Sequence, residues 1–167
     1  MSRYDEAIYD YSSGTGGNFK IKSSSSRKKP LIKALTIRRP WAELILRGRK
    51  PYELRSWRTK YRGPLAIHAA MRVDAEDARQ LGLNPEKLIT SSFVGVVILS
   101  DVRPYTREDA RLLEKRRAGF GWFPDSFAWI LKKPRRISPI KAKGQLSLFK
   151  VPPAAGRRII RVLRNGH

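Results

Sequence analysis

A lysine, a glutamate and an arginine follow a glycine at fixed spacing in residues 48–55, which read GRKPYELR. Lys50 and Arg55 can hold a phosphate or the acceptor atoms of a nucleobase, and the guanidinium of Arg55 offers a planar fork of donors. Glu53 can accept hydrogen bonds from exocyclic amino or ring N–H groups. The same three charges can instead form an ion-pair network that steadies a strand edge, and their spacing leaves both interpretations open.

A strand over residues 52–57 is expected to position these side chains. Because successive side chains alternate in a strand, Glu53, Arg55 and Trp57 would project to one face. A carboxylate, a guanidinium and an indole on one face suit a base or a phosphate better than a hydrophobic core. Lys50 lies just before the strand, from where it can fold back towards Glu53.

The rest of the chain predicts an α+β domain. Alternating and apolar segments predict about six short strands, over residues 33–37, 52–57, 64–70, 93–99, 126–131 and 144–151. Two or three helices are expected, from Pro40 to Gly48, over 74–81, and from Thr106, where a pattern like a capping box begins. Gly95, within the most apolar strand, indicates a bend or a close approach of another segment. These elements fit a small, partly closed β-barrel with flanking helices.

Three parts of the chain differ in composition. Residues 1–30 are rich in serine and glycine and predict a flexible basic arm. Residues 31–152 hold the expected domain. Residues 153–167 form a basic extension in which arginines flank apolar pairs, so this segment can be an added strand, a docked helix or a tail that orders on RNA.

Charge is the strongest compositional signal. The 167 residues hold 36 lysines and arginines against 14 aspartates and glutamates, a net charge of +22. Residues 33–151 hold 26 basic and 11 acidic side chains, or +15, so the basic character belongs to the domain. Like charges at this density repel one another, and a polyanion relieves the repulsion while releasing counterions. The composition therefore favours nucleic acid over a membrane surface, an acidic protein or a merely solvated face.

Several kinds of chemistry do not fit this composition. The chain contains no cysteine and only two histidines, which excludes disulfides, thiolate metal sites and a cysteine nucleophile. We expect no metal and no cofactor. No apolar run approaches 18 residues, and Asp5, Glu6 and Asp10 do not fit a signal peptide. A cytoplasmic protein without a membrane segment is expected.

The motif and its surroundings resemble the ASCH domain, a β-barrel family related to PUA-type RNA-binding domains. The Gly-x-Lys-x-x-Glu-x-Arg pattern is similar to the signature of that family. The likeness extends over 33–151, through LTIRRPWA (35–42), RSW (55–57), YRGPLAIH (61–68), FAWIL (127–131) and KGQLSLF (143–149). This resemblance implies a cleft beside the signature, suited to RNA or a modified nucleobase and lined by Lys50, Glu53 and Arg55.

The resemblance also implies a hydrolytic alternative. One branch of these domains contains acetylcytidine amidohydrolases, which use a lysine, a threonine three residues later and a more distant glutamate. Lys50 matches that lysine, but Glu53 stands at the threonine position, so the expected nucleophile is missing, and we identify no matching distant acid. Other members are reported as ribonucleases, for which Lys50 and Glu53 would serve as an acid–base pair. Binding of RNA is the main prediction, hydrolysis of RNA or a modified nucleoside is the alternative, and whether the protein is an enzyme stays open.

Further side chains are candidates for contact with nucleic acid. Trp57, Tyr61 and Trp122 can stack on unpaired bases, although core packing is the alternative for each. Trp122 belongs to a glycine-containing segment, residues 119–124, that could cover a cleft. His68 either reaches into the cleft or is a satisfied buried histidine, which we favour. Candidates for phosphate contacts are Arg38, Arg39, Arg62, Lys132, Lys133, Arg135 and Arg136. RNA is the expected partner and single-stranded DNA the second candidate, and the sequence predicts no particular protein partner.

Overall fold

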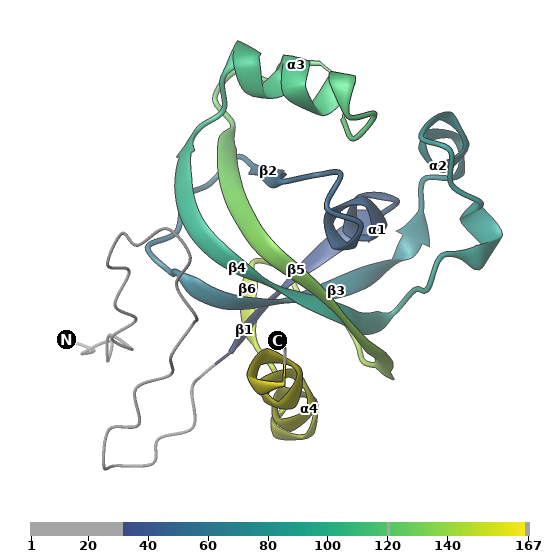
Figure 1. Ribbon diagram of the computed structural model, residues 1–167, viewed down its shortest axis with the longest axis vertical. Coiled ribbons are helices and arrows are strands. Elements are labelled where there is room, and N and C mark those ends of the chain that lie inside the picture. Colours follow the sequence, from purple (N-terminus) through teal and green to yellow (C-terminus); the bar gives the residue numbers. More distant parts are fainter. Residues whose placement is uncertain (1–31, 120, 166–167) are drawn as a thin grey trace. The chain divides into compact units, whose positions relative to one another are not determined.

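The computed structural model describes residues 32–119 and 121–165 (Figure 1). The predicted N-terminal arm and Phe120 of the segment 119–124 lie outside the described residues. In chain order the elements are β1 (Lys33–Arg39), α1 (Trp41–Leu46), β2 (Tyr52–Arg55), β3 (Gly63–Val73), α2 (Ala75–Gln80), the 3₁₀ turn η1 (Pro85–Lys87), β4 (Ser92–Pro104), α3 (Arg107–Lys115), β5 (Phe127–Lys141), β6 (Leu148–Lys150) and α4 (Pro153–Arg164).

The six strands form one mixed sheet in the order β2-β5-β4-β3-β1-β6. β1 and β3 are parallel, and the other neighbouring strands are antiparallel. β2 and β6 are the edges, and within the described residues they do not pair with one another, so the sheet is not closed into a barrel. The prediction of an α+β domain with about six strands is confirmed, and residues 32–165 hold four helices rather than two or three.

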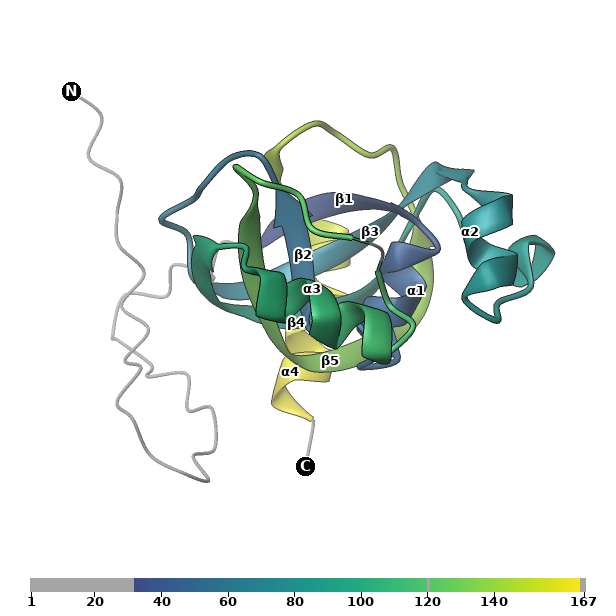
Figure 2. The same ribbon diagram turned by 90° about the horizontal axis from the view of Figure 1, so that it is seen from above.

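The two faces of β1 pack into separate cores. Leu35 and Ile37 of β1 belong to the core beneath α1, whereas Ala34 packs with Ala155 and Ile159 of α4. This division follows from the alternation of side chains along a strand. Figures 1 and 2 accordingly show α1 and α4 on opposite sides of the sheet. The C-terminal extension is thus a docked helix, one of the three forms that the sequence left open.

Strand β5 is longer than the sequence predicts, ending at Lys141 rather than at 131. Its pairing with β4 is irregular between Val96 and Ile98, and Lys133 there has a φ of 50°. A bulge of this kind accommodates Pro134, because the proline then takes no hydrogen bond away from a regular ladder. The basic run at 132–136 therefore belongs to a central strand.

Gly95 on β4 makes the close approach that the sequence predicts. A Cβ built on Gly95 would collide with the side chain of Leu46 in α1 and would lie 2.6 Å from the carbonyl oxygen of Arg135. Glycine at this position therefore allows α1, which precedes the signature segment, to lie directly on the sheet.

We expect Gly95→Ala to lower the free energy of unfolding by about 1–3 kcal/mol, because the added methyl group overpacks this contact. Gly156→Ala in α4 is the matched control, since a Cβ there has no atom within 4 Å. The control should be neutral or stabilising by about 0.5–1 kcal/mol, as alanine favours a helix. Urea denaturation followed by circular dichroism measures both. Equal stability of the two variants would contradict the close packing at Gly95.

Candidate functional site

The signature residues form a compact ionic cluster. Lys50 Nζ lies 3.0 Å from Glu53 Oε2, and Arg55 Nη2 lies 3.2 Å from Glu53 Oε1. The ammonium of Lys50 also donates to the carbonyl of Tyr52, at 2.5 Å. Lys50 and Glu53 are only 5% and 7% exposed. The structure thus contains the ion-pair network, in a buried form, on the edge strand β2.

The turn after α1 brings Lys50 to Glu53. Gly48 has a φ of 71°, in the left-handed region that glycine adopts without strain. The backbone N–H groups of Arg49 and Lys50 both donate to the carbonyl of Leu44, at 3.0 and 3.1 Å. These bonds satisfy the end of the helix and direct the chain straight into β2. The glycine and the lysine of the motif are therefore linked through the local fold.

Arg55 is the most exposed member of the cluster, with 26% of its side chain accessible. Its Nη2 donates to the carbonyl of Thr36 at 2.9 Å as well as to Glu53. Its Nε is buried without a hydrogen-bond partner among the described residues. Because Lys50 and Glu53 are occupied by one another, Arg55 is the signature side chain best placed to meet a ligand.

His68 lies in the core, 1% exposed. Its Nε2 donates to the carbonyl of Ala142 at 2.9 Å, and its Nδ1 lies 3.4 Å from the hydroxyl of Thr36. Burial lowers the pKa of His68, although the bond to Ala142 opposes this. The ring is therefore neutral with both nitrogens partnered, which is the satisfied buried histidine favoured from the sequence. Its neighbour Thr36 connects it to Arg55.

The two aromatic side chains after β2 pack inward. β2 ends at Arg55, two residues earlier than predicted, so Trp57 does not continue the strand face of Glu53 and Arg55. Trp57 packs edge-on against Trp129 with ring centroids 4.6 Å apart, and Trp129 Nε1 donates to the Trp57 carbonyl at 3.2 Å. Tyr61 also packs against this core. Core packing, the alternative kept for both residues, is what the structure shows.

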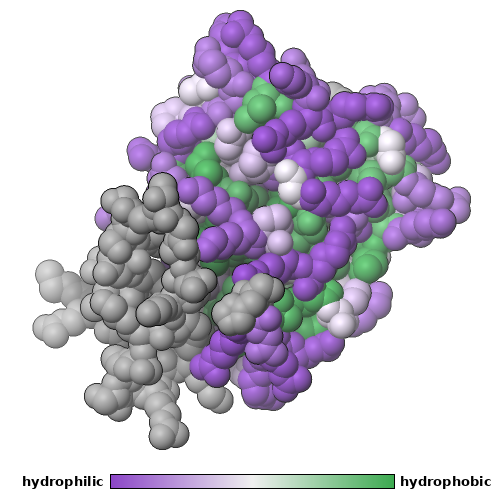
Figure 3. All heavy atoms as spheres, in the orientation of Figure 1, coloured by the Kyte–Doolittle hydropathy of each residue, from purple (hydrophilic) through white to green (hydrophobic). Residues whose placement is uncertain are grey.

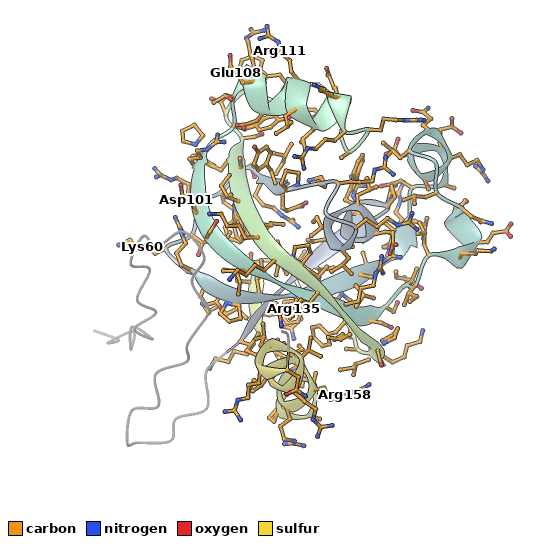
Figure 4. The ribbon with its side chains drawn as sticks, viewed as in Figure 1. Lys60, Asp101, Glu108, Arg111, Arg135 and Arg158 are labelled. Atoms are coloured by element: carbon orange, nitrogen blue, oxygen red, sulfur yellow. The ribbon has the colours of Figure 1, made fainter. Side chains whose placement is uncertain are left out.

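A hollow lies at the segment that joins β2 to β3, which begins directly after Arg55. It has a volume of about 470 Å³ and is lined by Arg58, Thr59, Lys60, Arg62 and Val102. Arg62 Nη2 forms an ion pair with Asp101 Oδ1 at 3.1 Å. Lys60 and Asp101 lie on the same flank of the sheet in Figure 4. Residues 56–62 are called the basic segment below.

With this geometry established, the chain can be compared with known proteins. The model of the ASCH domain family matches residues 35–141, more than half of the chain. The chain belongs to the ASCH family. Solved structures agree in fold: ASCH from Zymomonas mobilis superposes with a TM-score of 0.53 at 14% identity, covering 78% of this chain and 94% of that one. A mutant of the same protein gives the same TM-score and identity, covering 78% and 97%. No curated protein matches the chain.

Other predicted residues of this ASCH domain lie away from the signature cluster. Arg38 is exposed and pairs with Asp74 at 3.6 Å. Trp122 is 39% exposed, with the guanidinium of Arg107 over its ring at 4.2 Å. Figure 4 shows Arg135 between the sheet and α4, and its Nη1 donates to a carbonyl of that helix at 3.1 Å. The remaining basic candidates are Lys132 and Lys133, exposed on β5, and Arg39 and Arg136, which meet at Glu43.

Sequence reasoning missed Arg58 and Lys60 of the ASCH domain's hollow, and Glu43. The signal for the first two was present, because cations alternate with aromatic residues through SWRTKYRG, residues 56–63. Glu43 stands four residues from both Arg39 and Arg47, the spacing of helical ion pairs. The described residues contain no cluster of three histidine or carboxylate side chains able to hold a metal ion.

Proposed function

We propose that this ASCH domain binds RNA, with Arg55 and the basic segment as its contact surface. The observation that carries the proposal is the hollow lined by Arg58, Lys60 and Arg62, in the segment that follows Arg55 along the chain. Arg55 and Arg58 are three residues apart, so their Cα atoms lie within about 10 Å. Four cations along one short stretch of surface suit successive phosphates of a nucleic-acid strand.

The surface charge supports the same conclusion. Five of the carboxylates in the described residues are engaged in ion pairs with arginine or lysine: Glu43, Glu53, Asp74, Asp101 and Asp109. Residues 33–151 nevertheless keep an excess of 15 positive charges after all 11 of their carboxylates are counted. On the face shown in Figure 3, hydrophilic side chains cover most of the surface. No helix among the described residues is long and apolar enough to span a membrane.

The burial and mutual pairing of Lys50 and Glu53 favour binding over hydrolysis. An acid–base pair must reach the proton that it transfers. Lys50 and Glu53 are nearly buried and hold one another at 3.0 Å. We propose RNA rather than DNA as the ligand because the family resembles PUA-type domains, which bind RNA. Trp122 and Phe123, which are 39% and 52% exposed, supply surfaces on which an unpaired base can stack.

The test compares two triple variants that each remove three positive charges. One replaces Arg58, Lys60 and Arg62 with glutamine, and the other, as control, replaces the exposed α4 residues Arg157, Arg158 and Arg161. Affinity for a single-stranded RNA is measured by fluorescence anisotropy between about 50 and 200 mM salt. If about six phosphates are neutralised, log K of the wild type should fall against log salt with a slope of about −4.

The basic-segment variant should lose about tenfold or more in affinity, and its slope should become shallower by about 2, because three contacts are gone. The α4 variant should change less. Equal losses of affinity in the two triple variants would show that binding depends on the total charge and not on where the charge lies. A DNA strand of the same sequence, if bound equally well, would remove the preference for RNA. Product released from RNA or acetylcytidine by wild type but not by a Lys50→Ala protein would favour hydrolysis.

A further inference from the structure

A second pocket lies on another part of the domain, between α1, the end of β5 and the segment around η1. Its volume is about 230 Å³. Four basic side chains line it, Arg39, Arg47, Lys87 and Arg136, together with one carboxylate, Glu43. None of the signature residues 48–55 lines it. The pocket is therefore a site distinct from the signature cluster, and any ligand of it is recognised by other residues.

Glu43 cannot balance the charge that surrounds it. Its two oxygens accept from both ends of the Arg136 guanidinium, at 2.5 and 3.1 Å. Arg47 Nε lies 2.8 Å from the same carboxylate, and Arg39 Nη2 lies 3.7 Å from it. Burial alone would raise the pKa of Glu43, but hydrogen bonds from Arg136 and Arg47 outweigh it and hold the pKa below its usual value. One ionised carboxylate thus faces three guanidinium groups and Lys87.

Arg39 is left without enough partners. Its side chain is 1% exposed, and its Nε and Nη1 are buried without a hydrogen-bond partner among the described residues. A buried charged donor that is unsatisfied is costly, and an acceptor brought by a ligand removes that cost. Burial, opposed by Glu43, also lowers the pKa of Arg39. The pocket therefore combines an excess of positive charge with a buried arginine whose hydrogen bonding is incomplete, and both features favour an anion.

We propose that this pocket binds a phosphate group. Guanidinium groups match the geometry of phosphate oxygens with paired donors, and three of them converge here. Pockets for drug-sized ligands measure about 300–1,000 Å³, so this smaller pocket suits a phosphate rather than a whole nucleotide. The phosphate can belong to a nucleic-acid strand or to a free monoester. The inference does not depend on the RNA contact at the basic segment.

Isothermal titration of the whole protein with inorganic phosphate, at constant ionic strength, tests the proposal. Arg136→Gln and Arg47→Gln each remove a guanidinium that is about half exposed, with 49% of each side chain accessible, so both variants should fold. Each should weaken phosphate binding by about tenfold or more. Arg158→Gln on α4, which removes the same charge from an exposed position, should bind as the wild type does. A wild type that binds no phosphate, or an equal loss in all three variants, would overturn the proposal.

Competition identifies the source of the phosphate. If an RNA with a 5′-phosphate displaces inorganic phosphate and the same RNA with a 5′-hydroxyl does not, the pocket takes a strand end. If both RNAs displace it, the pocket takes a phosphodiester, and if only a nucleoside monophosphate does, it takes a free monoester. Displacement that persists undiminished in Arg136→Gln would place the phosphate elsewhere and contradict the assignment. The basic-segment triple variant should bind inorganic phosphate normally, which separates this test from that of the proposed function.

Discussion

Replacing Glu53 with glutamine should lower the free energy of unfolding by about 3–5 kcal/mol, the usual cost of leaving one partner of a buried ion pair uncompensated. Lys50 is 5% exposed and holds Glu53 Oε2 at 3.0 Å, and Arg55 holds the other oxygen at 3.2 Å. The amide carries no charge, so both cations would lose their counterion, and for Lys50 this would happen where little water reaches it. Urea denaturation followed by circular dichroism measures the change.

Two further variants make this result specific. Asp101→Asn removes the partner of Arg62 from a more exposed pair, in which the Asp101 side chain is 56% accessible, and should cost about 0–1 kcal/mol. Lys50→Met combined with Glu53→Leu replaces the buried pair by apolar groups and should recover much of the loss. If Glu53→Gln costs no more than Asp101→Asn, the cluster does not behave as a buried network.

The parts of the ASCH signature have different places in the fold. Its glycine ends α1, its lysine and glutamate fasten the edge strand β2, and its arginine stands where β2 passes into the basic segment. Lys50 and Glu53 then act by positioning, and Arg55 is the member that a strand of RNA would meet. Under the proposed function, the motif therefore divides into a structural part, Lys50 and Glu53, and a contact part, Arg55.

Most of the fold followed from local patterns. The alternation at 33–37, the apolar run at 93–99 and the capping box at Thr106 each depend on residues close in sequence, and each was predicted. Thr106 Oγ1 accepts from the Asp109 N–H at 3.2 Å, and Asp109 Oδ2 accepts from the Thr106 N–H at 3.0 Å. The length of β5 was not predictable in this way, because Pro134 argues against a strand until its pairing with β4 supplies a bulge.

In the candidate site too, features that depend on neighbouring residues were accessible from the sequence, and features that depend on distant residues were not. The spacing of Lys50, Glu53 and Arg55 made their pairing one of two open interpretations, because all three lie on one local turn and strand, and the structure shows the pairs. The inward packing of Trp57 was not, because it depends on Trp129, 72 residues away. The pairing of Arg136 with Glu43 bridges 93 residues and lies beyond any local pattern.

Trp129→Ala is expected to be as destabilising as the loss of Glu53, at about 3–5 kcal/mol, because it empties a fully buried site. Trp129 is 0% exposed and stands opposite Glu53 in the pairing of β5 with β2. Trp129→Phe should cost less, since the benzene ring fills part of the space. Trp122→Ala, at a residue 39% exposed, should cost about 1 kcal/mol or less. Thermal and urea denaturation rank the three variants.

The ranking also tests how the fold serves the basic segment. Trp129 holds the first part of that segment twice, through its ring edge against Trp57 at 4.6 Å and through its N–H to the Trp57 carbonyl at 3.2 Å. Trp129→Phe removes the N–H and leaves an aromatic ring in place, so it should weaken RNA binding beyond its effect on stability when affinity is measured at low temperature on folded protein. Unchanged affinity in Trp129→Phe would mean that Arg58, Lys60 and Arg62 contact RNA without the hydrogen bond from Trp129 to the Trp57 carbonyl. Their long, flexible side chains would then reach the phosphates without a fixed backbone.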